Sequence, residues 1–486
     1  MQVQKPSILR RAGPLMVARL AVAAISFTIP MVLARVLLPA SYGTFKQAWL
    51  LSNTLFFVLP MGLTQSLVYF VPREPDKRHH FIAHVLSITT LVGLVAGGAL
   101  LALTPLIARG FHNDELVACM PIVAAFTFFR LAGTSLDVVY MCQGRIKESA
   151  LVRVGSEAFY TACLVSSALH FHSVTGAFAG IAVATFARAL MAWFLLVREH
   201  GFHLSVPDLR RQLSYALPFG LAYAIIIPQQ QFHSYLVSAS VTAAAFAVYS
   251  VGCFQLPIVD MLYTPVSEIL QLGIAEHDRE GDRHGAHRLF REAVSRLSFV
   301  FLPTMALLFI VAPTLVSFLF TDRYLESVPI FRLAMVSIPM AALPLDGVMR
   351  ARAQNKFVLR VSVIKLALTV PLVFLGLKQF GPIGALGGWI CAEESCRMIL
   401  LWRASQLFEV SVLQAVPTRE IFYQVIAALS AVPVGLAVLH FAAGPKLLTL
   451  FACGAAFGMT YLGTLRATGR LPPVREWIPT RAAAAV

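Results

Sequence analysis

Residues 297–320 read LSFVFLPTMALLFIVAPTLVSFLF, and none of them is charged. An apolar run of roughly 20 residues is long enough to cross the hydrocarbon core of a membrane as a helix. The whole chain shares this character, because 58% of its 486 residues are hydrophobic and only 13% are charged. A soluble domain has about 25% charged residues. The sequence therefore predicts an all-α polytopic membrane protein and excludes a soluble enzyme, a disordered chain and a secreted disulfide scaffold.

Similar hydrophobic windows predict about fourteen transmembrane helices along the chain. Their approximate limits are 13–38, 42–71, 81–108, 116–142, 150–171, 174–197, 213–237, 242–272, 294–320, 327–349, 357–377, 382–402, 421–441 and 446–465. The fifth window contains Arg153 and Glu157, and the eleventh contains Arg360 and Lys365. Polar groups at membrane depth must be satisfied within the protein, so we expect the polar faces of both helices to be shielded from lipid.

The basic residues predict how the chain is oriented. Of the 39 Lys and Arg residues, 28 fall on one side of the membrane when the loops are assigned alternately, 4 fall on the other side, and 7 lie within the spans. Lys and Arg concentrate in cytoplasmic loops. We therefore expect a multi-pass protein of the bacterial inner membrane with both termini in the cytoplasm. This bias also explains most of the formal charge of +15 without a nucleic-acid partner.

Several short motifs recur in the same order at offsets between 202 and 211 residues, which indicates an internal duplication. The matched pairs include Tyr42-Gly-Thr-Phe45 with Phe246-Ala-Val-Tyr249, Phe129-Arg-Leu-Ala132 with Phe331-Arg-Leu-Ala334, Leu136-Asp137 with Leu345-Asp346, and Gly176-xxx-Gly180 with Gly384-xxx-Gly388. We expect two parallel six-helix repeats, an N-lobe over 1–205 and a C-lobe over 206–410. Two extra helices in 411–466 and a cytoplasmic tail over 467–486 would complete a two-lobed alternating-access transporter.

Seven basic residues lie within the predicted spans and are the first candidates for a site. They are Arg19, Arg35, Lys46, Arg130, Arg188, Arg332 and Lys365. Placing a cation at bilayer depth costs about 2.5–3.5 kcal/mol even on the lenient insertion scale, so these side chains should face a wet cavity or a partner. Arg35 and Lys46 are near helix ends, where snorkelling to the surface is an equal alternative.

Fewer acids are available within the spans, and we expect them to serve in gating, coupling or structural pairing. Arg130 and Asp137 are seven residues apart, a spacing that puts both on one face of a continuous helix. Asp137 and Asp346 occupy equivalent positions in the two repeats, as do Arg130 and Arg332. These four residues could form salt bridges that gate transport or ion pairs that only stabilise the fold, and the sequence does not separate the two roles. Glu393 precedes Glu394 in a mid-helix position, where the pair could neutralise Arg397 or carry a proton.

The seventh predicted helix contains Pro228-Gln-Gln-Gln231. A proline within a helix removes a backbone hydrogen bond and bends the helix. Consecutive glutamines point in different directions, so Gln229 or Gln230 should face the expected cavity. Their amides suit sugar hydroxyls, and hydrogen bonds between helices are an equal alternative.

The sequence contains no HExxH motif, no P-loop and no credible catalytic triad. Its histidines and cysteines show no metal-ligand spacing. We therefore expect neither an enzyme nor a metal or other cofactor, and the missing P-loop excludes a built-in ATPase motor.

The repeats, the YGTF motif, the series FRLA…LD…QGR over 129–145 and the glycine start Thr175-Gly-Ala177 together resemble a known family over residues 7–410. They resemble the polysaccharide-transporter branch of the multidrug/oligosaccharidyl-lipid/polysaccharide (MOP) exporter superfamily, which includes the O-antigen and exopolysaccharide repeat-unit flippases. The resemblance implies a V-shaped two-lobe fold and the flipping of undecaprenyl-diphosphate-linked oligosaccharide to the periplasmic leaflet. The two extra helices are similar to those of lipid II flippases, in which basic residues of the first helices contact the diphosphate. Arg19 is the closest match to such a residue here.

An anionic headgroup also suits the intramembrane cations, since Arg can grip phosphate oxygens bidentately. We expect the diphosphate to contact some of Arg19, Arg188, Lys365, Arg35 and Lys46. The expected partners are the lipid-linked oligosaccharide, membrane lipids, a coupling proton or sodium ion, and other polysaccharide assembly proteins. The alternative is an ion-coupled multidrug exporter on the same architecture, which predicts an acidic cavity. A membrane glycosyltransferase or polymerase is disfavoured because the predicted outer loops are only a few residues long.

Overall fold

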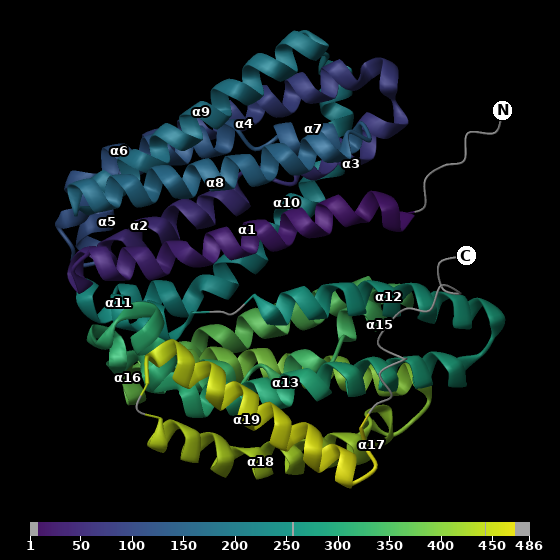
Figure 1. Ribbon diagram of the computed structural model, residues 1–486. Coiled ribbons are helices and arrows are strands. Elements are labelled where there is room, and N and C mark those ends of the chain that lie inside the picture. The colour runs from purple at the N-terminus through teal and green to yellow at the C-terminus, as the bar shows by residue number, and fades with distance from the viewer. Residues whose placement is uncertain (1–7, 255–256, 443, 472–486) are drawn as a thin grey trace. The chain divides into compact units, whose positions relative to one another are not determined.

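The computed structural model describes residues 8–254, 257–442 and 444–471, and for 8–17, Arg19 and Ile258 it describes the backbone alone. All regular elements in these ranges are helices (Figure 1). The predicted all-α fold is thereby confirmed. The chain divides into two compact units, Met1–Val248 (unit 1) and Tyr249–Val486 (unit 2). We describe each unit by itself.

Unit 1 contains the first repeat and the helix that begins the second. Its elements are α1 (Ile8–Val36), α2 (Pro39–Val58), α3 (Leu63–Arg73), η1 (Pro75–Lys77), α4 (Arg78–Ala102), α5 (Thr104–Gly110), α6 (Glu115–Ala132), α7 (Leu136–Cys142), α8 (Ile146–Phe171), α9 (Val174–His200) and α10 (Val206–Ser238). The next helix, α11 (Ala243–Gly252), crosses the unit boundary. Because α10 packs on α2, α3 and α4, the compact unit extends beyond the repeat boundary expected at residue 205.

Three of the expected spans in unit 1 are each divided into two helices: 42–71 into α2 and α3, 81–108 into α4 and α5 at Leu103, and 116–142 into α6 and α7. Between α2 and α3, Pro60 cannot donate a backbone hydrogen bond and Gly62 adopts a left-handed conformation with φ 74°. Between α6 and α7, the backbone stops being helical at Gly133. A Cβ atom at Gly133 would lie 3.0 Å from the backbone nitrogen of Ala189, so this break lies tight against α9.

Unit 2 contains the remaining helices. They are α12 (Ile258–Glu280), α13 (Arg283–Phe320), η2 (Asp322–Ser327), α14 (Val328–Met335), η3 (Pro339–Ala342), α15 (Leu345–Ala351), α16 (Asn355–Phe408), α17 (Val412–Ala415), α18 (Thr418–Phe441) and α19 (Lys446–Ala467). The long α16 is two helices joined at Gly381, which has φ 66° and ψ −153°. The expected spans 357–377 and 382–402 lie on either side of this joint.

The Gly-xxx-Gly segments of the two repeats both lie at close helix contacts. A Cβ atom at Gly180 of α9 would collide with the carbonyl of Cys163 on α8. A Cβ atom at Gly388 in the second part of α16 would collide with the carbonyl of Leu372 in the first part. In each repeat the sixth helix therefore packs backbone to backbone on the fifth.

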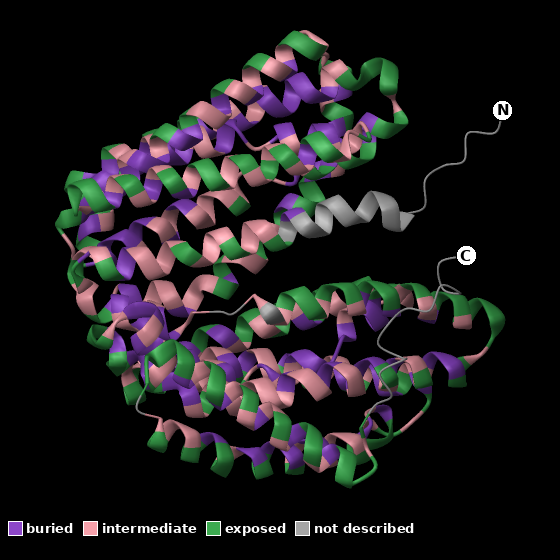
Figure 2. Cartoon of the chain, in the orientation of Figure 1, coloured by how far each residue is buried: buried purple, intermediate pink, exposed green. Residues whose placement is uncertain are grey.

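Nine helical segments in the described part of the chain are long and apolar enough to cross a membrane. Their outward faces carry large exposed hydrophobic side chains, such as Leu190 and Phe194 on α9. Figure 2 shows exposed residues, in green, along many of these helices. A broad apolar surface of this kind is expected where a helix meets lipid. The chain is therefore a multi-pass membrane protein. The expected count of fourteen spans stays a prediction, because α8, α10 and α12 carry too many polar residues to qualify by composition.

Candidate functional site

A cavity of about 760 Å³ lies inside unit 1. This volume is typical of a ligand pocket. Helices α1, α2, α6, α7, α8 and α9 and Gln65 of α3 contribute its walls. Its charged lining residues are Lys46, Arg130, Arg153 and Arg188, opposed by Asp137 and Glu157. Among the described lining residues, cations therefore outnumber acids by two.

Arg188 on α9 is fixed at the break between α6 and α7. Its Nη2 donates to Asp137 Oδ1 at 3.0 Å, and its Nε donates to the carbonyl of Gly133 at 3.2 Å. The break leaves that carbonyl without its helical partner, and the guanidinium supplies one. Because the Asp137 side chain is only 12% exposed, this acid is engaged by Arg188 and contributes little free negative charge to the cavity.

Arg130 on α6 is surrounded by aromatic rings and one amide. Its guanidinium carbon lies 3.9 Å from the centroid of Phe56 and 5.0 Å from that of Trp49. Its Nη2 donates to Asn53 Oδ1 at 3.1 Å, while its Nη1 is buried and has no hydrogen-bond partner among the described residues. Cation–π contacts hold the group in place without neutralising it. An unsatisfied donor on a positive group favours an anionic ligand.

The expected placement of Arg130 and Asp137 on one helix face is wrong. Arg130 is in the last turn of α6, and Asp137 is in the first turn of α7 beyond the break. The seven-residue spacing applies only to an unbroken helix, so the two groups take different partners.

Lys46, Arg153 and Glu157 complete the charged lining. Lys46 Nζ lies 5.4 Å from the centroid of Tyr42 and, in the described part of the chain, has no acid within ion-pair distance. Arg153 is exposed on α8, and Glu157 one turn further accepts a hydrogen bond of 2.6 Å from the Ser26 hydroxyl. The two acids thus have partners, whereas Lys46 keeps its charge available.

The cavity also contains residues that the sequence reading did not select. They are Trp49, Phe56, Gln65, Arg153, Glu157 and Tyr160. Arg153, Glu157 and Tyr160 lie at helical spacing on one face of α8. The weak hydropathy of the fifth predicted helix was the signal for this face, which is directed into the cavity rather than toward lipid.

Other predicted site residues are not among the described lining residues of this cavity. The side chain of Arg19 lies outside the described residues, and Arg35 is exposed in the last turn of α1. On α10, Gln229 is buried and Gln230 is exposed, and neither lines the cavity. Arg332 of unit 2 donates to the carbonyl of Phe309 at 3.0 Å.

Lys365 and Asp346 of unit 2 are both engaged by neighbours. Lys365 Nζ lies 2.5 Å from Glu393 Oε2, so this cation is neutralised within its own helix pair. Asp346 accepts hydrogen bonds from the hydroxyls of Tyr263 and Ser267 and pairs with Arg350 at 3.2 Å. Within unit 2, Lys365 and Asp346 therefore each have a partner of opposite charge.

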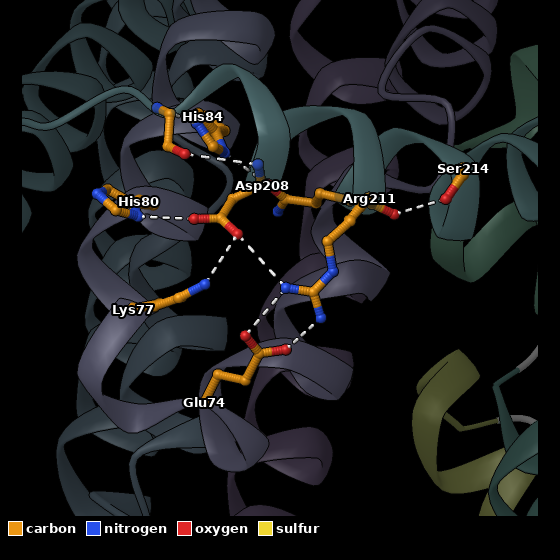
Figure 3. A network of polar contacts seen from close by, with 9 residues as sticks. Glu74, Lys77, His80, His84, Asp208, Arg211 and Ser214 are labelled. Atoms are coloured by element: carbon orange, nitrogen blue, oxygen red, sulfur yellow. Dashed lines mark hydrogen bonds and ion pairs between the residues drawn. The ribbon is translucent and has the colours of Figure 1, made fainter.

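A polar network ties the start of α10 to η1 and α4 (Figure 3). Asp208 accepts a hydrogen bond of 2.9 Å from His80 Nδ1 and lies 3.4 Å from Lys77 Nζ. Arg211 forms a bidentate pair with Glu74 at 2.7 and 3.2 Å. Burial by itself would raise the pKa of Asp208, but the hydrogen bonds from His80 and Ser205 and the charge of Lys77 outweigh it and lower the pKa.

His84 extends this network into the interior of unit 1. Its Nε2 accepts a hydrogen bond of 3.0 Å from the backbone N–H of Ser205, which caps α10, and its Nδ1 lies 3.1 Å from Gln212 Oε1. A backbone N–H can only donate, so Nε2 is unprotonated and Nδ1 carries the hydrogen. The network therefore fixes one end of α10.

Comparison with known proteins agrees with this architecture. The model of a family described as polysaccharide biosynthesis protein matches residues 32–329, more than half of the chain. None of the curated proteins matches the chain. Among solved structures, the lipid II flippase MurJ in an inward closed conformation is similar with a TM-score of 0.67 and 12% identity, covering 95% of this chain and 100% of that chain.

Two further structures show the same fold. A multidrug resistance MATE family transporter of the MOP superfamily in an inward-facing conformation has a TM-score of 0.59 at 14% identity, covering 84% of this chain and 98% of its own. A MOP superfamily transporter from Pyrococcus furiosus, whose binding pocket is described as having reverse polarity, has a TM-score of 0.57 at 13% identity, covering 83% and 95%. These are flippases and transporters rather than enzymes. The chain therefore belongs to the polysaccharide biosynthesis protein family and has the fold of the MOP superfamily transporters.

Proposed function

We propose that this protein flips undecaprenyl-diphosphate-linked oligosaccharide, an O-antigen or exopolysaccharide repeat unit, from the cytoplasmic to the periplasmic leaflet of the bacterial inner membrane. The observation that carries the proposal is the excess of cations in the unit 1 cavity, where both acids already have partners. The polysaccharide biosynthesis family supports the glycan part of the substrate.

The headgroup would bind where the cavity offers charge without a counter-ion. Lys46 supplies a compact ammonium, and Arg130 supplies the buried Nη1 that has no partner in the described part of the chain. A diphosphate has several strong acceptor oxygens and can use both groups at once. Arg153 would add a third contact, and Arg188 would hold the cavity wall through Asp137. Arg19 and Arg35 on α1 remain further candidates, and Gln229 and Gln230 remain candidates for sugar contacts.

Transport would follow alternating access between an N-lobe over 1–205 and a C-lobe over 206–410. Both termini would be cytoplasmic, as the placement of 28 basic residues in alternate loops predicts. Arg130, Asp137, Arg332, Asp346 and Glu393 would contribute to gating or coupling, and a proton or sodium ion would drive the cycle. Membrane lipids and other polysaccharide assembly proteins would be the remaining partners.

The competing function is an ion-coupled multidrug exporter of the same superfamily. An exporter of cationic drugs would be served by an acidic cavity, because an unpaired cation repels the substrate. The excess positive charge beside Lys46 and Arg130 therefore favours the anionic lipid-linked substrate. Drug-resistance profiles of a deletion strain separate the two functions directly.

The experiment is complementation of a deletion strain with Lys46→Ala, Arg130→Ala and Arg153→Ala variants at matched protein level. We expect surface polysaccharide to fall in Lys46→Ala and Arg130→Ala while the lipid-linked intermediate accumulates. Lys378→Ala is the matched control, because this exposed lysine lies at the end of a helix in unit 2. Unchanged polysaccharide in all three cavity variants would contradict the proposal.

A further inference from the structure

Two adjacent glutamates in the second part of α16 have opposite surroundings. Glu393 lies between two cations, with Lys365 Nζ at 2.5 Å and Arg397 Nε at 3.3 Å. Each carboxylate oxygen of Glu393 is therefore satisfied by a positive donor. This glutamate is ionised and has the neutralising role that its sequence position allowed.

Glu394 has no such partner. Both of its carboxyl oxygens are buried, and neither has a hydrogen-bond partner among the described residues. The nearest cation is Arg397, whose Nε lies 4.0 Å from Glu394 Oε2, beyond hydrogen-bond distance. Arg397 already donates to Glu393 and, through Nη1, to the carbonyl of Met340 at 3.1 Å. A buried carboxylate without a donor is costly, whereas the neutral carboxylic acid is not.

The other charged and titratable groups of the packed elements leave Glu394 without compensation. These groups are Lys365 in the first part of α16, Arg332 on α14, and Asp346 and Arg350 on α15, with Tyr263 of α12 bonded to Asp346. On α13, which also packs on α16, Arg283, Arg291 and Arg296 pair with Glu409, Glu420 and Glu292. Lys365 is neutralised by Glu393, and Arg332 donates to a backbone carbonyl. Asp346 takes the hydroxyl of Tyr263 and the guanidinium of Arg350. None of them supplies a proton donor to Glu394.

We propose that Glu394 is a proton-binding site of unit 2 and that it takes up and releases one proton in each transport cycle. In the state described here it is the neutral acid. Arg397 provides the switch, because it holds the turn η3 through the Met340 carbonyl. If η3 moves, Arg397 loses its contact with Met340 and can pair with Glu394. The O–H bond of the Glu394 carboxylic acid then breaks. The carboxylate stays beside the guanidinium of Arg397, and the proton passes to water. The coupling rests on the proposed transport function, whereas the proton site does not.

The test of the proton site uses the purified full chain in lipid nanodiscs. Infrared difference spectra recorded across a pH titration should contain the C=O band of a protonated carboxylic acid. We expect that band to be lost in Glu394→Gln and retained in Glu393→Gln, which is the matched control one residue away. A band that persists in Glu394→Gln, or that is lost only in Glu393→Gln, overturns the site. Glu394→Asp keeps a titratable carboxyl group and should show the band at a shifted position. This variant still tests the site if Glu394→Gln misfolds.

The test of the coupling uses the deletion strain. We expect Glu394→Gln to fail to restore surface polysaccharide at matched protein level, and Glu394→Asp to restore part of it. Wild-type amounts of polysaccharide in Glu394→Gln overturn the coupling. If the wild-type gene itself restores no polysaccharide, the proposed function fails, and the infrared result still decides whether Glu394 binds a proton.

Discussion

Arg188 in unit 1 and Arg397 in unit 2 hold equivalent helix breaks. Arg188 donates to the carbonyl of Gly133 between α6 and α7, and Arg397 donates to the carbonyl of Met340 between α14 and α15. The two arginines are 209 residues apart, within the range of offsets of the sequence repeat. In each repeat the fourth helix is interrupted, and an arginine of the sixth helix donates to a backbone carbonyl within the interruption. The Gly133 carbonyl has no other donor among the described residues, whereas the Met340 carbonyl also accepts from the backbone N–H of Leu343. The acids differ, since Arg188 pairs with Asp137 and Arg397 with Glu393.

The pairing of Arg188 with Asp137 leads to the first prediction. Arg188→Ala leaves Asp137 half-buried without a counter-ion, so it should destabilise unit 1 more than Asp137→Asn, which keeps a hydrogen-bond acceptor for the arginine. A double-mutant cycle on thermal unfolding should give a coupling energy of about 1–3 kcal/mol. The cycle Arg198→Ala with Asp137→Asn is the control and should be additive. A coupling near zero would mean that the pair does not hold α9 to α7.

The sequence predicted the all-α membrane fold correctly, but it did not predict where individual helices are interrupted. Hydropathy reports whether a segment can be in lipid, so the spans around 297–320 and 174–197 were found. It does not report backbone conformation, and the interruption at Gly133 separated Arg130 from Asp137. Gly381 likewise joins two expected spans without a loop. Each of these breaks depends on the backbone conformation of one or a few residues, which a mean hydropathy over a window of residues does not report.

For the candidate site, the sequence identified cations but not their partners. Lys365 and Lys46 have the same charge and a similar apolar context in the sequence. Only the fold reveals that Glu393 neutralises Lys365, while Lys46 faces Tyr42. Arg153 and Glu157 were visible as a polar face on the fifth predicted helix, but its direction required the packing of α8 against α9 and α1. Distances between helices, not composition, decide which charge is free.

The second prediction concerns anion binding by Lys46. Inorganic pyrophosphate, used as a probe of the headgroup site, should stabilise the purified protein against heat by mass action. A hydrogen bond between charged groups contributes about 1.5–3 kcal/mol, so Lys46→Ala should weaken pyrophosphate binding roughly tenfold or more. Lys46→Arg should keep most of the affinity, and Lys378→Ala should keep all of it. Equal thermal shifts in wild type and Lys46→Ala would place the anion elsewhere.

The third prediction concerns pH and Asp208 (Figure 3). The pKa of Asp208 is lowered in the folded protein, so its charged form stabilises the fold above the pKa of the unfolded chain. That contribution is lost as the pH falls through the lowered folded pKa. Asp208→Asn should therefore reduce the Tm at neutral pH, and the difference from wild type should shrink progressively with acidification. Glu280→Gln, at the far end of α12, is a control with an exposed acid. If the difference in Tm between Asp208→Asn and wild type did not change with pH, Asp208 would stabilise the fold through its packing and neutral hydrogen bonds and not through its charge.

The fourth prediction tests the backbone contact between α9 and α8. A Cβ atom at Gly180 would collide with the Cys163 carbonyl, which is part of a rigid helix and cannot give way as a side chain can. Gly180→Ala should therefore destabilise unit 1 by about 1–3 kcal/mol, the usual cost of overpacking. Gly98→Ala on α4 is the matched control, because a Cβ atom there meets nothing within 4 Å. Alanine restricts the unfolded chain more than glycine, so Gly98→Ala should raise stability by about 0.4–1 kcal/mol. Two thermal unfolding curves that move in the same direction would exclude the close contact as the reason for glycine at 180.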